Sequence, residues 1–278
     1  PIDDAVKYMK EAIVKSYGRR GEEIVNMNYK AVDAGVENLK KMDVPADWAN
    51  APDDEAVERN VPDFITRIVD VMNAQMGDTL PVSAFKDAAD GTFPQGTSKY
   101  EKRGIAVNVP KWLPEHCIQC NQCSLVCPHA CIRPFLLTDE EADNAPEEFP
   151  TLQGSKPYDN YKYRIQVSVL DCTGCGVCAE TCPTKTKSLV MEPIGDHYLE
   201  SKNWDYAVSL PRKANPMGKA SIKGSQFEQP LLEFSGACSG CGETPYVSLV
   251  TQLFGDRMQI ANATGCSSIW GGSAPSMP

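Results

Sequence analysis

The stretch CTGCGVCAETCP at residues 172–183 repeats the cysteine spacing of CIQCNQCSLVCP at residues 117–128. In each stretch three cysteines recur at every third residue, a fourth follows four residues later, and a proline comes next. Ligands at every third residue allow a tight loop to wrap three corners of an iron–sulfur cubane. The repeated spacing therefore predicts two 4Fe–4S clusters.

This spacing is that of bacterial ferredoxins, in which the fourth cysteine binds the other cluster. We expect each fourth cysteine to begin a short helix and to point away from its own loop. Cluster one is then held by Cys117, Cys120, Cys123 and Cys182, and cluster two by Cys172, Cys175, Cys178 and Cys127. Zinc is the competing metal, but zinc sites use pairs of cysteines rather than two such triplets.

Four more cysteines lie outside this pattern. Cys131 is expected to be a small buried thiol on the helix after Cys127. Cys238, Cys241 and Cys266 stand among glycines and serines and are one ligand short of a third cubane. Because all 12 cysteines lie in two clusters and none in the first 116 residues, ligand binding explains them better than a disulfide framework does.

The composition is that of a globular protein of 278 residues, with a net charge of −10. An acidic surface argues against nucleic acid as a partner. No run approaches the roughly 18 apolar residues of a membrane helix, and no signal peptide pattern is visible, so we expect a cytoplasmic protein. The absence of an initiating methionine suggests a piece of a longer chain.

Apolar periodicity predicts two amphipathic helices within residues 2–40 and a short one near residues 64–77. Residues 78–112 are interpreted as a β-rich connector with a turn at Asp90-Gly91, since a phosphate loop would need a different order of glycine and lysine. Residues 161–170 predict a strand. The interval between the motifs, residues 132–171, is acidic at 139–148 and is expected to be a surface insertion. Residues 205–230 are expected to be a linker.

Several motifs together resemble pyruvate:ferredoxin (flavodoxin) oxidoreductases, a family of large multidomain enzymes that use thiamine diphosphate. They are EHCIQCNQC at 115–123, YEKRGIA at 100–106, GSQF at 224–227, FSGACSGCGETPY at 234–246 and NATGCSSIWGGSAP at 262–275. The resemblance implies an α+β multidomain fragment made of four parts. These are the end of a gamma-like α/β domain (1–50), a connector with the Glu-Lys-Arg motif (51–110), a two-cluster ferredoxin-like domain (111–204), and a linker with the start of an α/β thiamine diphosphate domain (205–278).

The resemblance also implies that Cys238, Cys241 and Cys266 bind a third 4Fe–4S cluster, whose fourth cysteine comes later in the family's chains. Glu243 and Cys266 would approach the thiamine diphosphate, which is bound with Mg²⁺. The implied reaction converts pyruvate and coenzyme A to acetyl-CoA and CO₂ and reduces ferredoxin or flavodoxin, in an enzyme expected to be a homodimer. This segment carries none of the bond-breaking groups, so we expect it to be inactive alone.

Two alternatives remain at this stage. One is a stand-alone polyferredoxin that only carries electrons. The other is a related 2-oxoacid oxidoreductase, or a pyruvate enzyme fused to an NADP reductase domain.

Overall fold

The computed structural model describes residues 1–51, 59–272 and 275–278. The chain divides into two compact units, residues 1–59 and residues 60–278. Both helices and small sheets occur, which confirms the predicted α+β class. Among the described residues, no helix has the length and apolarity needed to cross a membrane. Residues 44–62 are rich in proline, aspartate and asparagine, which predicts a linker, and part of this stretch lies outside the described residues.

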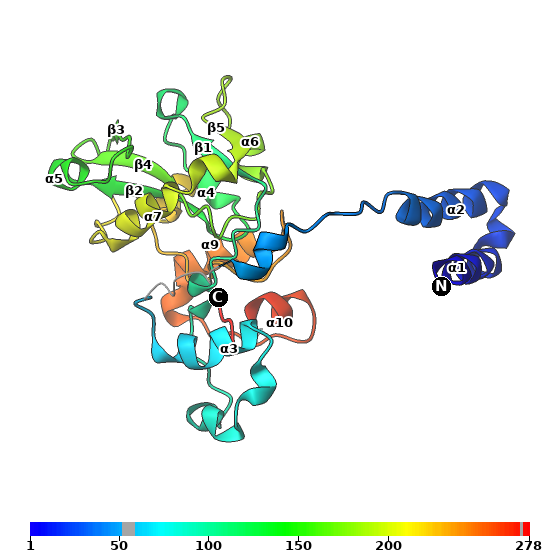
Figure 1. The fold of residues 1–278 in the computed structure, drawn as a ribbon. Coiled ribbons are helices and arrows are strands. Elements are labelled where there is room, and N and C mark those ends of the chain that lie inside the picture. Colours follow the sequence, from blue (N-terminus) through cyan, green and yellow to red (C-terminus); the bar gives the residue numbers. More distant parts are fainter. Residues whose placement is uncertain (52–58, 273–274) are drawn as a thin grey trace. The chain divides into compact units, whose positions relative to one another are not determined.

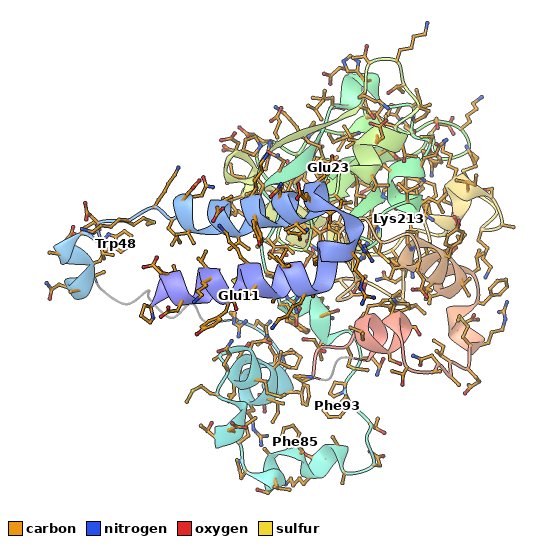
Figure 2. The ribbon with its side chains drawn as sticks, turned by 90° about the vertical axis from the view of Figure 1, so that its right-hand side faces the viewer. Glu11, Glu23, Trp48, Phe85, Phe93 and Lys213 are labelled. Atoms are coloured by element: carbon orange, nitrogen blue, oxygen red, sulfur yellow. The ribbon has the colours of Figure 1, made fainter. Side chains whose placement is uncertain are left out.

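The first unit is built on a helical hairpin of α1 (Ile2–Tyr17) and α2 (Glu22–Glu37), joined by the 3-10 turn Gly18–Arg20 (Figure 1). Both helices match the periodicity of the sequence. Figure 2 shows Glu11 on α1 and Glu23 on α2, and both side chains are exposed. A second 3-10 turn, Ala46–Asn50, follows the hairpin.

The connector at the start of the second unit consists of helical turns. The predicted apolar helix is present as the π-helical turn Ile65–Val69 followed by α3 (Asp70–Asn73). The prediction of a β-rich connector was wrong for most of residues 78–112, which form the 3-10 turns Gly77–Thr79, Val82–Ala88 and Thr97–Tyr100; only its last residues, 108–112, form a strand. Proline and glycine interrupt the alternation that a strand requires. Its apolar side chains include Phe93, which packs edge-on against Phe64 with ring centroids 6.1 Å apart (Figure 2).

Two antiparallel sheets surround the cysteine loops (Figure 1). One pairs β1 (Asn108–Trp112) with β5 (Leu189–Pro193), with Pro110 opposite Met191. The other has the order β2-β4-β3, and its strands are β2 (Ile132–Leu137), β4 (Lys162–Val167) and β3 (Leu152–Gln153). The predicted strand at 161–170 is confirmed as β4.

The interval between the cysteine motifs is part of the core, whereas it was expected to be a surface insertion. Its acidic part does form an exposed turn of helix, α5 (Asp139–Asp143), with a capping box from Thr138. However, the residues on either side of α5 build the three-stranded sheet. Tyr163 of β4 is fully buried, and so is Tyr158, whose ring stacks on that of Tyr163. Alternating aromatic and β-branched residues in 161–167 carry this core, so the acidic composition nearby was a misleading signal.

Short helices fill the rest of the second unit. They are the 3-10 turns Pro114–His116, Ile194–His197 and Gly255–Arg257, and the α-helices α4 (Gln122–Leu125), α6 (Val177–Thr181), α7 (Glu200–Ser209), α8 (Ile222–Ser225), α9 (Thr244–Phe254) and α10 (Cys266–Gly271). α7 packs against β4. The linker predicted for 205–230 is therefore only partly irregular, because residues 205–209 belong to α7 and the stretch contains α8.

Candidate iron–sulfur sites

The first cysteine loop and Cys182 line one cavity. Cys117, Cys120 and Cys123 come from residues 117–123, and Cys182 comes from the end of the second motif. Most other walls of this cavity are apolar or aromatic, and three polar side chains also line it. The apolar and aromatic residues include Trp112, Tyr163, Ile165 and Leu189, and the polar ones are Asn121, Thr184 and Ser188. The four residues expected to hold cluster one thus face the same space.

The turn of this loop depends on a left-handed backbone. Gln119 has φ +57° and Asn121 has φ +60°, a region that asparagine tolerates better than most residues do. Asn121 is 1% exposed, and its side chain accepts a hydrogen bond from the Tyr163 hydroxyl at 2.7 Å. The backbone N–H of Gln119 in turn points at the sulfur of Cys117, 3.4 Å away. The loop therefore presents N–H groups to sulfur, as a cluster-binding loop does.

The second loop and Cys127 line a separate cavity, with Cys172, Cys175 and Cys178 on its other sides. Two glycines shape this loop: Gly174 and Gly176 have φ of +69° and +74°. A Cβ on Gly174 would lie 2.9 Å from the carbonyl oxygen of Asn108, so β1 approaches too closely for a side chain. The structure brings together the four residues expected for cluster two.

The two fourth cysteines are exchanged between the loops, but they end helices instead of beginning them. Cys127 follows α4, and Cys182 is the residue at which α6 stops, with ψ 120°. Each precedes a proline, and a residue before proline is displaced from the helical region by the proline ring. The Cys-Pro pairs in the sequence were the signal for this, and the expectation overlooked it.

Both exchanged cysteines have lowered pKa values. The side chain of Cys131, with backbone N–H groups, lowers the pKa of Cys127 to about 6 in spite of its burial. Burial alone would raise the pKa of Cys182, but the hydroxyls of Ser188 and Thr184, each 3.2 Å from its sulfur, bring that pKa to about 7. Burial raises the pKa of four other ligand candidates, which are Cys117, Cys123, Cys172 and Cys178. Such thiols become thiolates when a cationic centre binds them.

Cys131 is buried, as expected, but it does not lie on a helix. It directly precedes β2 and lines the second cavity together with the four ligand candidates. Its N–H points at the sulfur of Cys127 (3.3 Å), and its thiol donates to the carbonyl of Asp171 (3.1 Å). The chain turns into a strand here because Pro128 ends the helical path.

The cavities fit a cluster better than a single ion. Each set of four thiols encloses a space, and among the described residues no three His, Cys, Asp or Glu side chains converge at single-ion spacing. Four thiols, N–H groups aimed at sulfur and apolar walls are the environment of a 4Fe–4S cluster. Zinc, the competing metal, would need four ligands at about 2.3 Å from one point.

The third group of cysteines is more open. Cys238 and Cys266 are exposed and Cys241 is half-buried. Cys266 begins α10, and that helix is tied to the loop of the other two by the indole N–H of Trp270, which donates to Glu243 at 3.3 Å. Glu243 precedes α9 and is itself exposed. The structure therefore places the two segments beside each other through Glu243 and not through their sulfurs.

The Cys238–Cys241 loop lies directly on the second cysteine loop. The hydroxyl of Ser239 donates to the carbonyl of Thr173 at 3.2 Å. A Cβ on Gly240 would lie 3.7 Å from the Cβ of Cys175. The third group is thus adjacent to the cluster two site.

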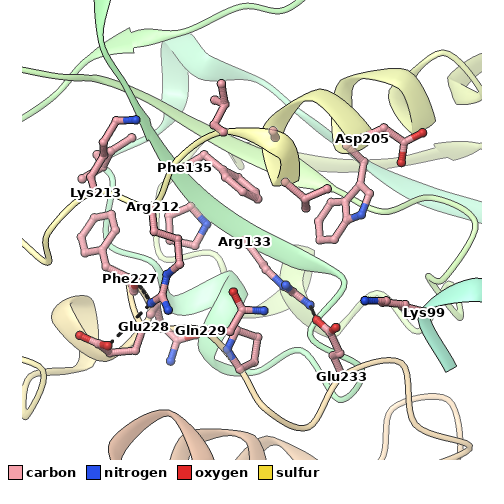
Figure 3. A pocket seen from close by; sticks show the side chains of 18 of the residues that line it. Lys99, Arg133, Phe135, Asp205, Arg212, Lys213, Phe227, Glu228, Gln229 and Glu233 are labelled. Atoms are coloured by element: carbon pink, nitrogen blue, oxygen red, sulfur yellow. Dashed lines mark hydrogen bonds and ion pairs between the residues drawn. The ribbon is translucent and has the colours of Figure 1, made fainter. Parts of the chain in front are cut away.

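A larger cavity of about 490 Å³ lies beside these sites and is lined by charged and aromatic side chains (Figure 3). Its charges are paired across elements: Arg133 of β2 pairs with Glu233, and Arg212 lies 3.8 Å from Glu228. Arg133 also lies 5.0 Å from the ring of Trp204 on α7. These contacts attach residues 226–234, which lead to Cys238, to the sheet of the two-cluster region.

Two family models match this chain. A 4Fe-4S dicluster domain matches residues 116–186, and a domain named EKR, described as a domain of unknown function, matches residues 51–106. The first match and the two thiol-lined cavities define the second unit as one that carries a two-cluster iron–sulfur domain.

Whole-chain relatives are more specific. The chain is 58% identical to pyruvate:ferredoxin oxidoreductase of Moorella thermoacetica and 56% identical to pyruvate-flavodoxin oxidoreductase of Enterobacter agglomerans, and it is covered completely in both. It is 48% identical, again over its full length, to mitochondrial pyruvate dehydrogenase (NADP(+)) of Euglena gracilis, of which it covers 15%. Over its whole length the chain is similar to a segment of the pyruvate:ferredoxin and pyruvate-flavodoxin oxidoreductases, and it spans 24% of the length of the first two relatives.

Proposed function

We propose that this chain is the electron-transfer segment of a pyruvate:ferredoxin (flavodoxin) oxidoreductase. The complete enzyme would convert pyruvate and coenzyme A to acetyl-CoA and CO₂ and pass two electrons, one at a time, to ferredoxin or flavodoxin. Thiamine diphosphate with Mg²⁺ would supply the electron sink for CO₂ release. The residues of this chain would hold the clusters through which the electrons leave.

Two complete ligand sets support this proposal. Cys117, Cys120, Cys123 and Cys182 would bind cluster one, and Cys172, Cys175, Cys178 and Cys127 would bind cluster two. Cys238, Cys241 and Cys266 would give three ligands to a third 4Fe–4S cluster. The four-part domain division at residues 50, 110 and 204 is part of the same proposal.

One observation carries the function: the Cys238–Cys241 loop packs on the loop of cluster two. Ser239 and Gly240 contact Thr173 and Cys175, so an electron at the third site would meet cluster two first. Cluster two shares its ligand runs with cluster one, which keeps those two close. Electrons would pass from the third cluster to cluster two, then to cluster one, and then to the carrier.

Glu243 and Cys266 would lie nearest the thiamine diphosphate. Glu243 already holds the helix of Cys266 through Trp270, and this contact would fix the position of the third cluster relative to the cofactor. A carboxylate at this position needs a partner once it is covered, and a cofactor group would provide one.

The partners follow from the same proposal. The relatives are named for ferredoxin or flavodoxin as acceptor, and we propose one of these carriers here, with pyruvate and coenzyme A as substrates of the complete, homodimeric enzyme. The net charge of −10 disfavours nucleic acid. We place the protein in the cytoplasm, where thiols stay reduced.

Iron analysis with EPR of the reduced protein tests the proposal. About eight irons per chain would indicate the two ferredoxin-type clusters, and about twelve would indicate a filled third site with a ligand from elsewhere. Zinc in place of iron would refute the cluster assignment. We expect the 278 residues alone to release no CO₂ from pyruvate. If they did release CO₂ in a CoA-dependent reaction, a role limited to electron transfer would be contradicted.

A further inference from the structure

The Glu-Lys-Arg stretch of the connector lies against the entry to the cluster two loop. The backbone N–H of Gly104 donates to the carbonyl of Leu170 at 2.8 Å, two residues before Cys172. Upstream, the hydroxyl of Ser98 donates to the carbonyl of Glu233 at 3.0 Å. Lys102 itself has φ +46°, an unusual backbone conformation for a lysine.

The side chain of Lys102 reaches a buried carboxylate. The ammonium of Lys102 forms an ion pair with Asp171, whose side chain is 3% exposed. Asp171 also accepts a hydrogen bond from the hydroxyl of Ser168 at 2.5 Å. The Lys102 ammonium lies 5.1 Å from the ring of Phe234, so it is covered on a second side.

Asp171 stands directly before the first ligand candidate of cluster two. Its carbonyl accepts the thiol of Cys131, which lines the same cavity. A cluster on four thiolates is anionic and becomes more so when reduced. A buried carboxylate beside it therefore disfavours reduction, and a cation paired with that carboxylate offsets this effect because charges interact strongly where water is excluded.

The other two members of the motif have different partners. Glu101 pairs with Arg103 at 2.7 Å and accepts a hydrogen bond from Ser276, which lies in the segment after Cys266. Thr97 holds the same segment, since its hydroxyl donates to the carbonyl of Pro275 at 2.8 Å. Of the three residues of the motif, Lys102 is the one that pairs with a residue next to the ligand candidates of cluster two.

We propose that Lys102 sets the reduction potential of the cluster held by Cys127, Cys172, Cys175 and Cys178 by compensating the buried charge of Asp171. This gives the connector an electrostatic role in electron transfer, with Lys102 as a positioning residue that touches neither substrate nor cluster. The inference rests on the proposed function, because it requires a cluster at this site.

The test is an EPR-monitored redox titration, at alkaline pH, of the protein that carries this chain. A Cys175→Ser variant identifies the signal of cluster two. We expect Lys102→Met to shift the potential of that cluster downward and to leave cluster one unchanged, whereas Lys102→Arg keeps the original potential. The matched control is Lys99→Met, because Lys99 is an exposed cation of the same segment whose ammonium lies over the ring of Tyr100.

A second variant covers the case in which Lys102→Met fails to fold. Asp171→Asn removes the anion and leaves the cation, so we expect the potential of cluster two to rise. Full iron content with an unchanged cluster two potential in either variant, or an equal shift in Lys99→Met, would overturn the role of Lys102 while leaving the proposed function intact. Absence of iron from the unaltered protein would overturn both.

Discussion

Replacement of Arg164 by methionine should destabilise the second unit strongly. The side chain of Arg164 is 3% exposed, on the strand whose neighbours Tyr163 and Ile165 line the cluster one cavity. Its guanidinium donates to the side chain of Glu200 and to the carbonyl of Pro150, both at 2.9 Å. Burial lowers the pKa of Arg164, an effect that the carboxylate of Glu200 opposes.

The size of the expected loss of stability follows from the charge of Glu200 that the substitution leaves without its partner. Removing one partner of a buried ion pair costs about 3–5 kcal/mol, because the other charge stays uncompensated. The side chain of Glu200 is 30% exposed and can be partly rehydrated, so the lower end of that range, about 3 kcal/mol, applies. For a domain of this size about 2–4 °C is lost per kcal/mol, which gives a fall of roughly 6–12 °C in the apparent Tm.

The assay is thermal loss of the visible absorbance of the clusters at a fixed scan rate, compared with far-UV circular dichroism. Arg212→Met is the control, since Arg212 is 57% exposed at its side chain and lies 3.8 Å from Glu228. We expect that control to change stability by less than about 1 kcal/mol. If the two variants melt at the same temperature, the interpretation of Arg164 as a buried structural cation is wrong.

Three further predictions concern single contacts. Tyr163→Phe removes the hydrogen bond to Asn121 and should cost about 1–3 kcal/mol in the free energy of unfolding, measured in denaturant, because it leaves a buried acceptor unpaired. Gly154→Ala places a Cβ 2.3 Å from a carbonyl oxygen and should lower the apparent Tm and the yield of iron-loaded protein; an unchanged Tm would contradict the close approach. Burial would raise the pKa of Glu141, but Lys213 and a backbone N–H outweigh it and hold that pKa below its ordinary value of 4.5. The contribution of ionised Glu141 to the stability of the fold is therefore complete above about pH 4.5 and is lost as the pH falls through the lowered pKa. Glu141→Gln should therefore cost less than about 1 kcal/mol at neutral pH and nothing in acid, which paired denaturation curves would check.

The features predicted best from sequence are those set by local spacing. The helices at 2–17 and 22–37 follow from apolar periodicity, and the β4 strand follows from alternation. The eight cysteines of the two motifs line two cavities in the predicted groups of four, since the spacing of ligands in a short segment constrains the geometry of its loop. The assignment of those residues to bound clusters stays a prediction.

What the sequence did not reveal depends on contacts between distant segments. Lys102 and Asp171 are separated by 69 positions, and no local pattern marks either as the partner of the other. The connector was misread because proline and glycine signal turns without saying whether the turns are extended or helical. The sheet around β2 was missed because the acidic composition of its neighbour, α5, was extended to the whole interval.

The exchange of Cys127 and Cys182 has a consequence for how the two clusters are built. Each exchanged thiol completes the site of the other loop, so neither cavity can close around four ligands until α4 and α6, which contact each other, are in place. These two thiols also have the lowered pKa values, about 6 and about 7, and so enter the thiolate form before their buried neighbours do. Cluster insertion at one site should therefore stabilise the ligand arrangement at the other, because binding energy at a site that exists only in the folded state is also folding energy.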